Sequence, residues 1–301
     1  MSPKLWRVKE TKRPCREASV KLFDGVSTFP SVYLIKSPAK PINYRAPAHV
    51  EHRVGDLRIL RLIQKWLKAG VSEDGEWSES KIGTPQGAVA SPLLANIYLH
   101  YAFDLWVEAW RRKVVRGDMI VVRYADDAVL GFEHKEEAER FLRELRERLA
   151  KFGLELHPEK TRLIEFGRYA APNREGRGEG KPETFDFLGF THICGKNGKT
   201  GYFVVSRKTV KKRMRAKLQA LKAELRRRMH EPVAETGKWL QSVVRGYYQY
   251  HAVPGNTTSL GLFRERLLRL WRPVIRRRSQ KRRPNWDRLG RLFDRGLPHP
   301  R

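Results

Sequence analysis

Near its middle the chain carries the stretch Met119-Ile-Val-Val-Arg-Tyr-Ala-Asp-Asp-Ala-Val-Leu-Gly-Phe132, in which two adjacent aspartates interrupt an apolar sequence. The apolar residues on both sides, with no room for a long loop, predict a strand, a tight turn and a second strand. The adjacent carboxylates of Asp126 and Asp127 repel each other, and a divalent cation would compensate both charges. Asp is also a common turn residue, so a solvated turn is the alternative interpretation.

Further motifs precede and follow this stretch. Upstream lies Gly83-Thr-Pro-Gln-Gly-Ala-Val-Ala-Ser-Pro-Leu-Leu-Ala-Asn-Ile-Tyr-Leu-His100, and downstream lie Leu156-His-Pro-Glu-Lys-Thr161 and Phe185-Asp-Phe-Leu-Gly-Phe190. Together with the Tyr-Ala-Asp-Asp turn, this series resembles the palm of reverse transcriptases. The alanine in that turn, the Pro-Gln-Gly tripeptide and the Ser-Pro-Leu-Leu-Ala-Asn segment are similar to those of the bacterial group II intron reverse transcriptase/maturases.

The resemblance covers residues 50–301 and includes Val244-Arg-Gly-Tyr-Tyr-Gln-Tyr-His-Ala-Val-Pro-Gly-Asn256 and Arg276-Arg-Arg-Ser-Gln-Lys281. It implies an α+β fold, with a partial right-hand polymerase palm followed by an all-helical thumb/maturase domain. We therefore expect three parts: an atypical, poorly ordered leader at 1–49, the partial palm at 50–200 and a basic helical domain at 201–301.

The same resemblance implies RNA-directed DNA synthesis and the binding of intron RNA for splicing. The cofactor would be Mg²⁺, and the partners would be group II intron RNA, a DNA primer or target, and deoxynucleotides. Asp126 and Asp127 would be the catalytic metal ligands. The expected substrate-binding residues are Tyr124, Gln86, Gly87, Lys160, Leu188 and Gly189. Taken singly, Gln86 is an ordinary turn residue and Lys160 a solvated lysine, so their assignment depends on the motifs around them.

One part of the family pattern has no match. A complete palm carries a further aspartate on an earlier strand, in a segment with Asp, an apolar residue, two further residues and Phe-Phe-Asp. Nothing between Met1 and His49 fits, and Asp24 stands in a different context. We therefore expect the carboxyl-terminal portion of such a protein, joined to an unrelated leader by truncation or a change of reading frame. Loss of a carboxylate that two metal ions share would weaken polymerisation severely.

The charge of the chain indicates a polyanionic partner. Lys and Arg number 62 against 33 Asp and Glu, which gives a formal net charge of +29 and a pI near 10.5. Residues 202–301 hold 27 Lys and Arg against 6 Asp and Glu, a net of +21. Interleaved aromatics can stack on unpaired bases, although most of them would fill a helical core. The expected RNA-binding residues are Lys211, Lys212, Arg213, Arg215, Arg245, Arg276, Arg277, Arg278 and Lys281.

Composition also argues against other classes of protein. The longest apolar segment, residues 88–110, contains Asp104 and Glu108 and does not form a spanning helix of about 20 apolar residues, so no membrane partner is expected. No apolar signal region with a small-residue cleavage site begins the chain, and we expect a cytoplasmic protein. Cys15 and Cys194 are too few and too far apart for a zinc module.

Hydrophobic periodicity predicts a hairpin at 193–205 and helices at 50–70, 92–110, 134–153, 206–229, 239–251 and 260–278. Residues 171–182 are predicted to be a glycine-rich loop without a phosphate-binding role, because no strand and helix flank it at the required spacing. Residues 1–49 carry prolines throughout and show no sustained period, so no element is predicted there.

Two functional hypotheses follow from these patterns. The first is an RNA-directed DNA polymerase whose activity in this chain is weak or absent. The second is a non-catalytic RNA-binding splicing cofactor or remnant, in which the palm serves only as a scaffold. A general DNA-binding protein is disfavoured, because no helix-turn-helix or zinc-finger pattern occurs.

Overall fold

The fold is that of a computed structural model, which describes residues 32–38, 54–68, 71–73, 76–78, 91–277, 290 and 297–300. The chain divides into two compact units, with a boundary in the sequence between Glu183 and Thr184. We refer to the described residues up to Glu183 as the amino-terminal unit and to those from Thr184 onward as the carboxyl-terminal unit. The boundary expected from the sequence, at 200/201, falls later, because the strands just after Thr184 group with the helices that follow them.

A four-stranded antiparallel sheet forms the centre of the amino-terminal unit, with the strand order β4-β5-β1-β6. Its strands are β1 (Val32–Pro38), β4 (Met119–Tyr124), β5 (Asp127–Phe132) and β6 (Arg162–Phe166). β4 and β5 form the predicted acidic hairpin. Residues 128–132 of β5 are all buried, as expected for an apolar strand with a neighbour on each side.

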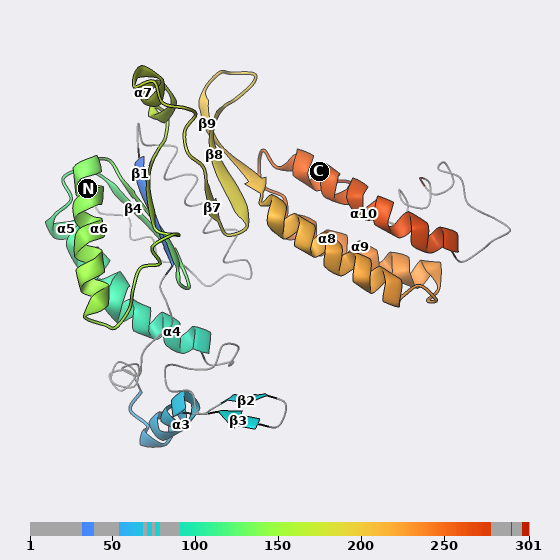
Figure 1. The fold of residues 1–301 in the computed structure, drawn as a ribbon, viewed down its shortest axis with the longest axis horizontal. Coiled ribbons are helices and arrows are strands. Elements are labelled where there is room, and N and C mark those ends of the chain that lie inside the picture. The colour runs from blue at the N-terminus through green and yellow to red at the C-terminus, as the bar shows by residue number, and fades with distance from the viewer. Residues whose placement is uncertain are drawn as a thin grey trace. The chain divides into compact units, whose positions relative to one another are not determined.

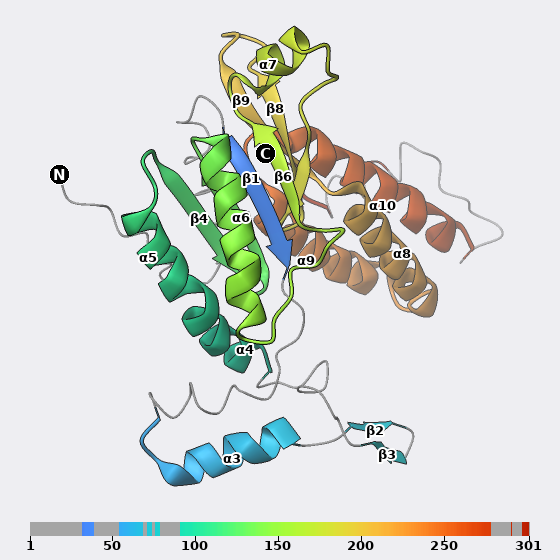
Figure 2. The same ribbon diagram turned by 60° about the vertical axis from the view of Figure 1, so that its left-hand side comes forward.

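Helices cover one face of this sheet (Figures 1 and 2). Helix α4 (Ser91–Leu99) continues through a π-helical turn, η1 (His100–Asp104), into α5 (Leu105–Lys113), and α6 (Lys135–Ala150) follows the hairpin. The ring of Phe141 on α6 packs edge-on against Trp110, with centroids 4.9 Å apart, and lies 5.1 Å from Phe132 of β5. The predicted helices at 92–110 and 134–153 are therefore confirmed.

Smaller elements complete the amino-terminal unit. They are α3 (Leu57–Lys68), the hairpin of β2 (Val71–Glu73) and β3 (Glu76–Ser78), and α7 (Ala170–Gly176). α7 corrects the prediction that the glycine-rich segment is entirely loop. Among the described residues, none of the helices combines the length and apolar character that crossing a membrane requires.

Strand β1 corrects the prediction that residues 1–49 contain no element. It lies between β5 and β6, with Tyr33 opposite both Phe132 and Glu165. Its apolar run is short and Pro38 ends it, so the sequence around it shows no sustained period. Proline is tolerated at a strand end, where its missing N–H removes no interior ladder bond. The rest of the expected leader lies outside the described residues.

The carboxyl-terminal unit combines a small sheet with three helices. The strands β7 (Phe185–Phe187), β8 (Phe190–Lys196) and β9 (Phe203–Thr209) pair in sequence order. The helices α8 (Lys211–Arg227), α9 (Val233–His251) and α10 (Thr257–Arg277) lie side by side (Figure 1). Their shared core includes Leu221, Val244, Phe263 and Trp271. The predicted start of the first helix, at residue 206, is corrected because residues 206–209 continue β9.

Candidate metal and nucleic-acid sites

The acidic pair lies at the tip of the β4–β5 hairpin. Tyr124 and Asp127 form the last pair of the ladder, so only Ala125 and Asp126 make the turn. Ala125 has a φ of 53°, in the left-handed region that a side chain disfavours. Asp126 is exposed and Asp127 is half-buried. The hairpin therefore presents two adjacent carboxylates, as the sequence predicts, on a turn whose backbone is strained at its first residue.

Beside this tip runs the end of β1. Pro38 is the register partner of Asp127, and Ser37 is the partner of Ala128. The strand Val32-Tyr-Leu-Ile-Lys-Ser-Pro38 contains no acidic residue. The strand that neighbours the acidic pair thus brings no aspartate or glutamate to it.

Asp24 and Asp56 are the other carboxylates that could supply the further ligand. Asp24 lies outside the described residues. Asp56 precedes α3, and its Oδ1 accepts a hydrogen bond of 2.8 Å from the backbone N–H of Arg58, as a helix N-cap does. In the described part of the chain, no three His, Cys, Asp or Glu residues gather closely enough to hold a metal ion.

The chemistry of the acidic pair nevertheless suits a hard divalent cation. Mg²⁺ prefers oxygen ligands and is commonly held by one or two carboxylates, with water and substrate phosphates completing its shell. Asp126 and Asp127 offer carboxylate oxygens on an exposed turn. They fit a single, mostly hydrated ion better than a closed two-metal centre.

Arg123, the residue that precedes Tyr124, anchors the hairpin, although it is not among the expected site residues. Arg123 donates hydrogen bonds to the carboxylate of Asp104, the side chain of Asn96 and the backbone carbonyl of Ala125. A basic residue inside an otherwise apolar strand was the only signal in the sequence.

The other expected substrate-binding residues are separated. Gln86 and Gly87 lie outside the described residues. Lys160 is exposed in the turn before β6, where its backbone N–H donates to the carbonyl of His157 at 3.2 Å. Contact between the Lys160 side chain and nucleic acid stays a prediction.

Leu188 and Gly189 form the two-residue turn between β7 and β8. Both have positive φ, 48° and 82°, which matches the hairpin turn that favours glycine. The hydroxyl of Tyr250 on α9 donates to the Leu188 carbonyl at 2.8 Å. A Cβ built on Gly189 would lie 3.3 Å from Nη1 of Arg213, so α8 also closely approaches this turn.

A cleft of about 490 Å³ opens between α8 and α9 near this turn. Arg213 and Lys217 line it from α8, and Ser242, Tyr250 and His251 line it from α9. Burial, together with the charge of Arg213, lowers the pKa of His251 to about 4, so this imidazole is neutral at pH 7. The positive charge of the cleft thus comes from Arg213 and Lys217.

The expected RNA-binding residues within the described range are all exposed. They are Lys211, Lys212, Arg213 and Arg215 on α8, Arg245 on α9, and Arg276 and Arg277 at the end of α10. Arg278 and Lys281 lie outside the described residues. The first turn of α8 contains no acidic residue.

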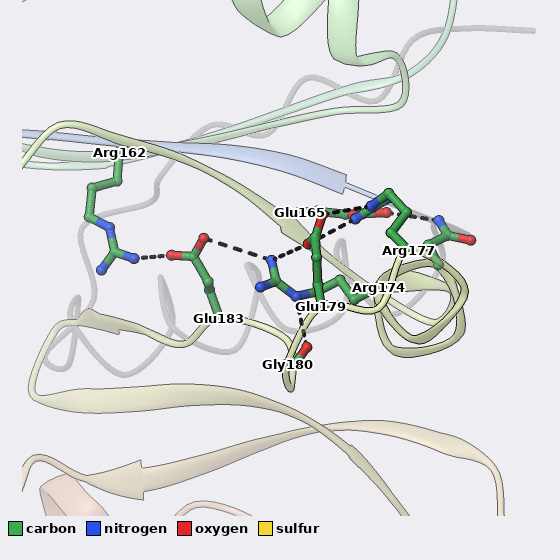
Figure 3. Close-up of polar contacts among 8 residues, drawn as sticks. Arg162, Glu165, Arg174, Arg177, Glu179, Gly180 and Glu183 are labelled. Atoms are coloured by element: carbon green, nitrogen blue, oxygen red, sulfur yellow. Dashed lines mark hydrogen bonds and ion pairs between the residues drawn. The ribbon is translucent and has the colours of Figure 1, made fainter.

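A second group of arginines is neutralised by carboxylates. Figure 3 shows this group, in residues 162–183: Arg162 pairs with Glu183, Arg174 with Glu179 and Glu183, and Arg177 with Glu179 and Glu165. Hydrogen bonds that the Arg177 guanidinium donates to Glu179 and Glu165 raise the pKa of Arg177 above its usual range. These pairs tie α7 and the following loop to β6, and they leave little free positive charge there for phosphates.

Part of the chain matches known proteins. Residues 45–192 match the reverse transcriptase (RNA-dependent DNA polymerase) family. The group II intron-encoded protein LtrA of Lactococcus lactis subsp. cremoris is 50% identical over 48 residues, which are 16% of this chain and 8% of that protein. Protein YkfC of Escherichia coli K12 is 34% identical over 108 residues, covering 27% of this chain and 28% of that protein.

Among solved structures, the chain is similar to apo telomerase from Candida tropicalis, which was truncated from its C-terminal domain. The match covers 64% of this chain and 38% of the telomerase chain, at 16% identity and a TM-score of 0.43. The chain thus spans well under two thirds of the length of LtrA and of YkfC. The match at residues 45–192 contains the acidic hairpin and the motifs on either side of it. Residues 45–192 are therefore similar to reverse transcriptases, and a shorter part of the chain is similar to the group II intron-encoded protein LtrA.

Proposed function

We propose that this chain binds structured group II intron RNA through its basic carboxyl-terminal helices and supports splicing. We further propose that its palm retains two metal-binding carboxylates but sustains little or no RNA-directed DNA synthesis. RNA binding is supported by the uncompensated cations at the start of α8. The weakness of DNA synthesis is supported by the register at the hairpin tip, where the acidic pair has Pro38 rather than a carboxylate opposite Asp127.

The charge distribution on α8 supports RNA binding. The amino terminus of a helix carries a partial positive charge, so cations there are unfavourable by about 0.3–1 kcal/mol each. α8 nevertheless begins with Lys211, Lys212 and Arg213, and no acid compensates them in its first turn. Phosphates would relieve this repulsion. The adjoining cleft, with Arg213 and Lys217 beside Tyr250, suits a nucleic-acid backbone with a base that stacks nearby.

The acidic hairpin supports retained binding of Mg²⁺. In a polymerase two such ions activate the primer hydroxyl and stabilise the departing pyrophosphate. Asp126 and Asp127 would hold one ion, and the DNA primer and a deoxynucleotide would have to supply most of its remaining oxygen ligands. The second candidate function, a splicing cofactor without polymerase activity, is favoured by the lack of an acidic residue on β1.

Two assays on the full chain test the proposal. We expect the protein to bind group II intron RNA and promote its splicing, and to extend a DNA primer on an RNA template weakly or not at all. Supplying the fingers and first palm segment of a complete relative should raise extension, and Asp126→Ala should remove that gain. Robust extension by the unsupplemented chain would show that another carboxylate completes the site. Failure to bind the RNA at low salt would refute the splicing role.

A further inference from the structure

The guanidinium of Arg123 is almost fully engaged in hydrogen bonds. Its Nε and Nη2 donate to the two carboxylate oxygens of Asp104 at 2.7 and 2.6 Å. Its Nη1 donates to Oδ1 of Asn96 at 2.9 Å and to the carbonyl of Ala125 at 2.8 Å. A bidentate pair of this kind fixes the plane of the guanidinium as well as its position. The side chain is only 16% exposed, so solvent screens the pair weakly.

The carbonyl that Arg123 holds belongs to the strained residue of the turn. Ala125 has a φ of 53°, and a left-handed non-glycine residue persists when its surroundings hold it there. Ala125 directly precedes Asp126, so the orientation of its peptide unit sets where the Asp126 backbone begins. Fixing the Ala125 carbonyl therefore fixes the direction in which the exposed carboxylate leaves the hairpin.

The anchors of Arg123 come from the helix that lies along the sheet. Asn96 belongs to α4, and Asp104 is the last residue of the π-helical turn η1. A π-helical turn adds a residue to the helical repeat, which changes the face that the following side chains occupy, and such turns are frequent at functional sites. Here the turn ends on the residue that meets Arg123. Asp104 Oδ2 also lies 3.5 Å from Nδ1 of His100, at the start of the same turn.

The ion pair between Arg123 and Asp104 also determines how much positive charge lies near the acidic pair. Because Asp104 neutralises Arg123, the guanidinium serves the turn as a hydrogen-bond donor and contributes little net charge to Asp126 and Asp127. Arg123 therefore does not compete with a divalent cation for the acidic pair, although it lies only three positions before Asp126 in the chain.

We propose that Arg123, held by Asp104 and Asn96, is a positioning residue that sets the backbone of the Ala125–Asp126 turn and so the spacing of the metal-binding carboxylates. This inference rests on the proposed metal site at Asp126 and Asp127. It goes beyond that proposal by assigning the geometry of the site to a contact between the hairpin and the π-helical turn.

The first test measures Mn²⁺ affinity by electron paramagnetic resonance on the full chain. Removal of an outer partner of a metal ligand commonly costs about 10–100-fold in affinity, and we expect a loss in that range for Arg123→Gln and for Asp104→Asn. Arg123→Lys should also lose Mn²⁺ affinity, because the lysine ammonium lacks the planar arrangement of donors of a guanidinium. Arg148→Gln is the matched control, since Arg148 donates to the η1 carbonyls of Tyr101 and Ala102 but not to the hairpin.

The second test measures backbone hydrogen exchange at residues 124–127 without metal. We expect faster exchange there in Arg123→Gln than in Arg148→Gln at matched global stability. Exchange that is equal in the two variants would overturn the positioning role whatever the metal result. Mn²⁺ binding that is lost in Asp126→Asn but intact in Arg123→Gln would overturn it as well. Mn²⁺ binding that Asp126→Asn leaves unchanged would instead refute the metal site, and the exchange result alone would then decide the role of Arg123.

Discussion

Asn256 is a buried polar side chain whose hydrogen bonds join two elements of the carboxyl-terminal unit. Its Oδ1 accepts from the backbone N–H of Thr209 at 3.0 Å, and its Nδ2 donates to the Thr209 hydroxyl at 2.8 Å and to the His251 carbonyl at 2.9 Å. The residue also directly precedes α10, where its backbone carbonyl accepts from Ser259. One amide thus connects the end of β9 with the α9–α10 connection.

Replacing this amide should be costly. Asn256→Ala would leave the buried N–H of Thr209 without its acceptor, and each such group costs about 1–3 kcal/mol. We expect the free energy of unfolding in urea to fall by about 2–4 kcal/mol. The exposed residue Gln249 on α9 provides the control, and Gln249→Ala should change stability little. Equal losses in the two variants would show that the hydrogen bonds of Asn256 contribute nothing particular.

Two buried histidines should make stability depend on pH. Burial and nearby arginines lower the pKa values of His192 and His251 to about 4, from an ordinary value of 6.5. Between these values the unfolded chain binds more protons than the folded chain. The stability that they confer is therefore complete above about pH 6.5 and is lost as the pH falls toward about 4.

The contribution of His251 can be isolated by substitution. We expect His251→Gln to reduce the loss of unfolding free energy between about pH 7 and about pH 4.5, because one depressed pKa is removed. His230→Gln, at an exposed position before α9, serves as the control and should leave the pH dependence unchanged. Identical pH dependence in the wild type and in His251→Gln would contradict the assignment.

At the scale of elements, α7 depends on its surroundings. It contains 7 residues, well below the length at which an isolated helix is stable in water. Glu165 on β6 accepts from Arg177 at 2.5 Å and from Asn173 at 2.8 Å, so a single carboxylate ties this short helix to the sheet (Figure 3). The Arg177 side chain is exposed in this pair although Glu165 is not, and ion pairs that reach solvent contribute little to global stability, so the effect should be local.

We therefore expect Glu165→Gln to speed hydrogen exchange in residues 170–179 while changing the global free energy of unfolding by less than about 1 kcal/mol. High salt should act in the same direction, because it screens the pairs. Glu139→Gln, which removes the Lys135–Glu139 pair on α6, is the control and should not affect α7. Unchanged exchange around α7 would mean that apolar contacts, rather than ion pairs, hold it.

At the scale of the whole molecule, the excess positive charge should control binding to RNA. The triple variant Lys211→Gln, Lys212→Gln and Arg215→Gln removes three exposed cations from α8. Each phosphate contact contributes about 0.7–0.9 to the slope of log K against log salt, so we expect the slope to fall by up to about 2–3. Filter-binding titrations over a range of salt concentrations would measure it.

A matched variant separates net charge from position. Arg143→Gln, Arg146→Gln and Lys151→Gln remove the same charge from exposed positions in and just after α6, outside the expected RNA-binding region. This variant should bind RNA nearly as the wild type does. Equal weakening by the two triple variants would indicate that the RNA responds to the overall charge rather than to α8.

Local patterns were sufficient to predict several parts of this protein. The periodicity of apolar residues, the turn residues and the charge predict the acidic hairpin, the helices at 92–110 and 134–153 and the basic carboxyl-terminal region. These are properties of neighbouring residues, and tertiary contacts reinforce them rather than override them. The family resemblance rests on short motifs of the same kind.

Contacts between distant residues decided the rest. β1 forms a strand because its backbone pairs with β5 on one side and with β6 on the other. Its short apolar run ending at Pro38 does not by itself predict a strand. Arg123 meets Asn96 and Asp104 only when the helix with its π-helical turn packs on the sheet, and Tyr250 reaches Leu188 across 62 residues of chain. Hydrogen bonds between such partners depend on three-dimensional geometry that no local period encodes, which is why only the folded chain identifies them.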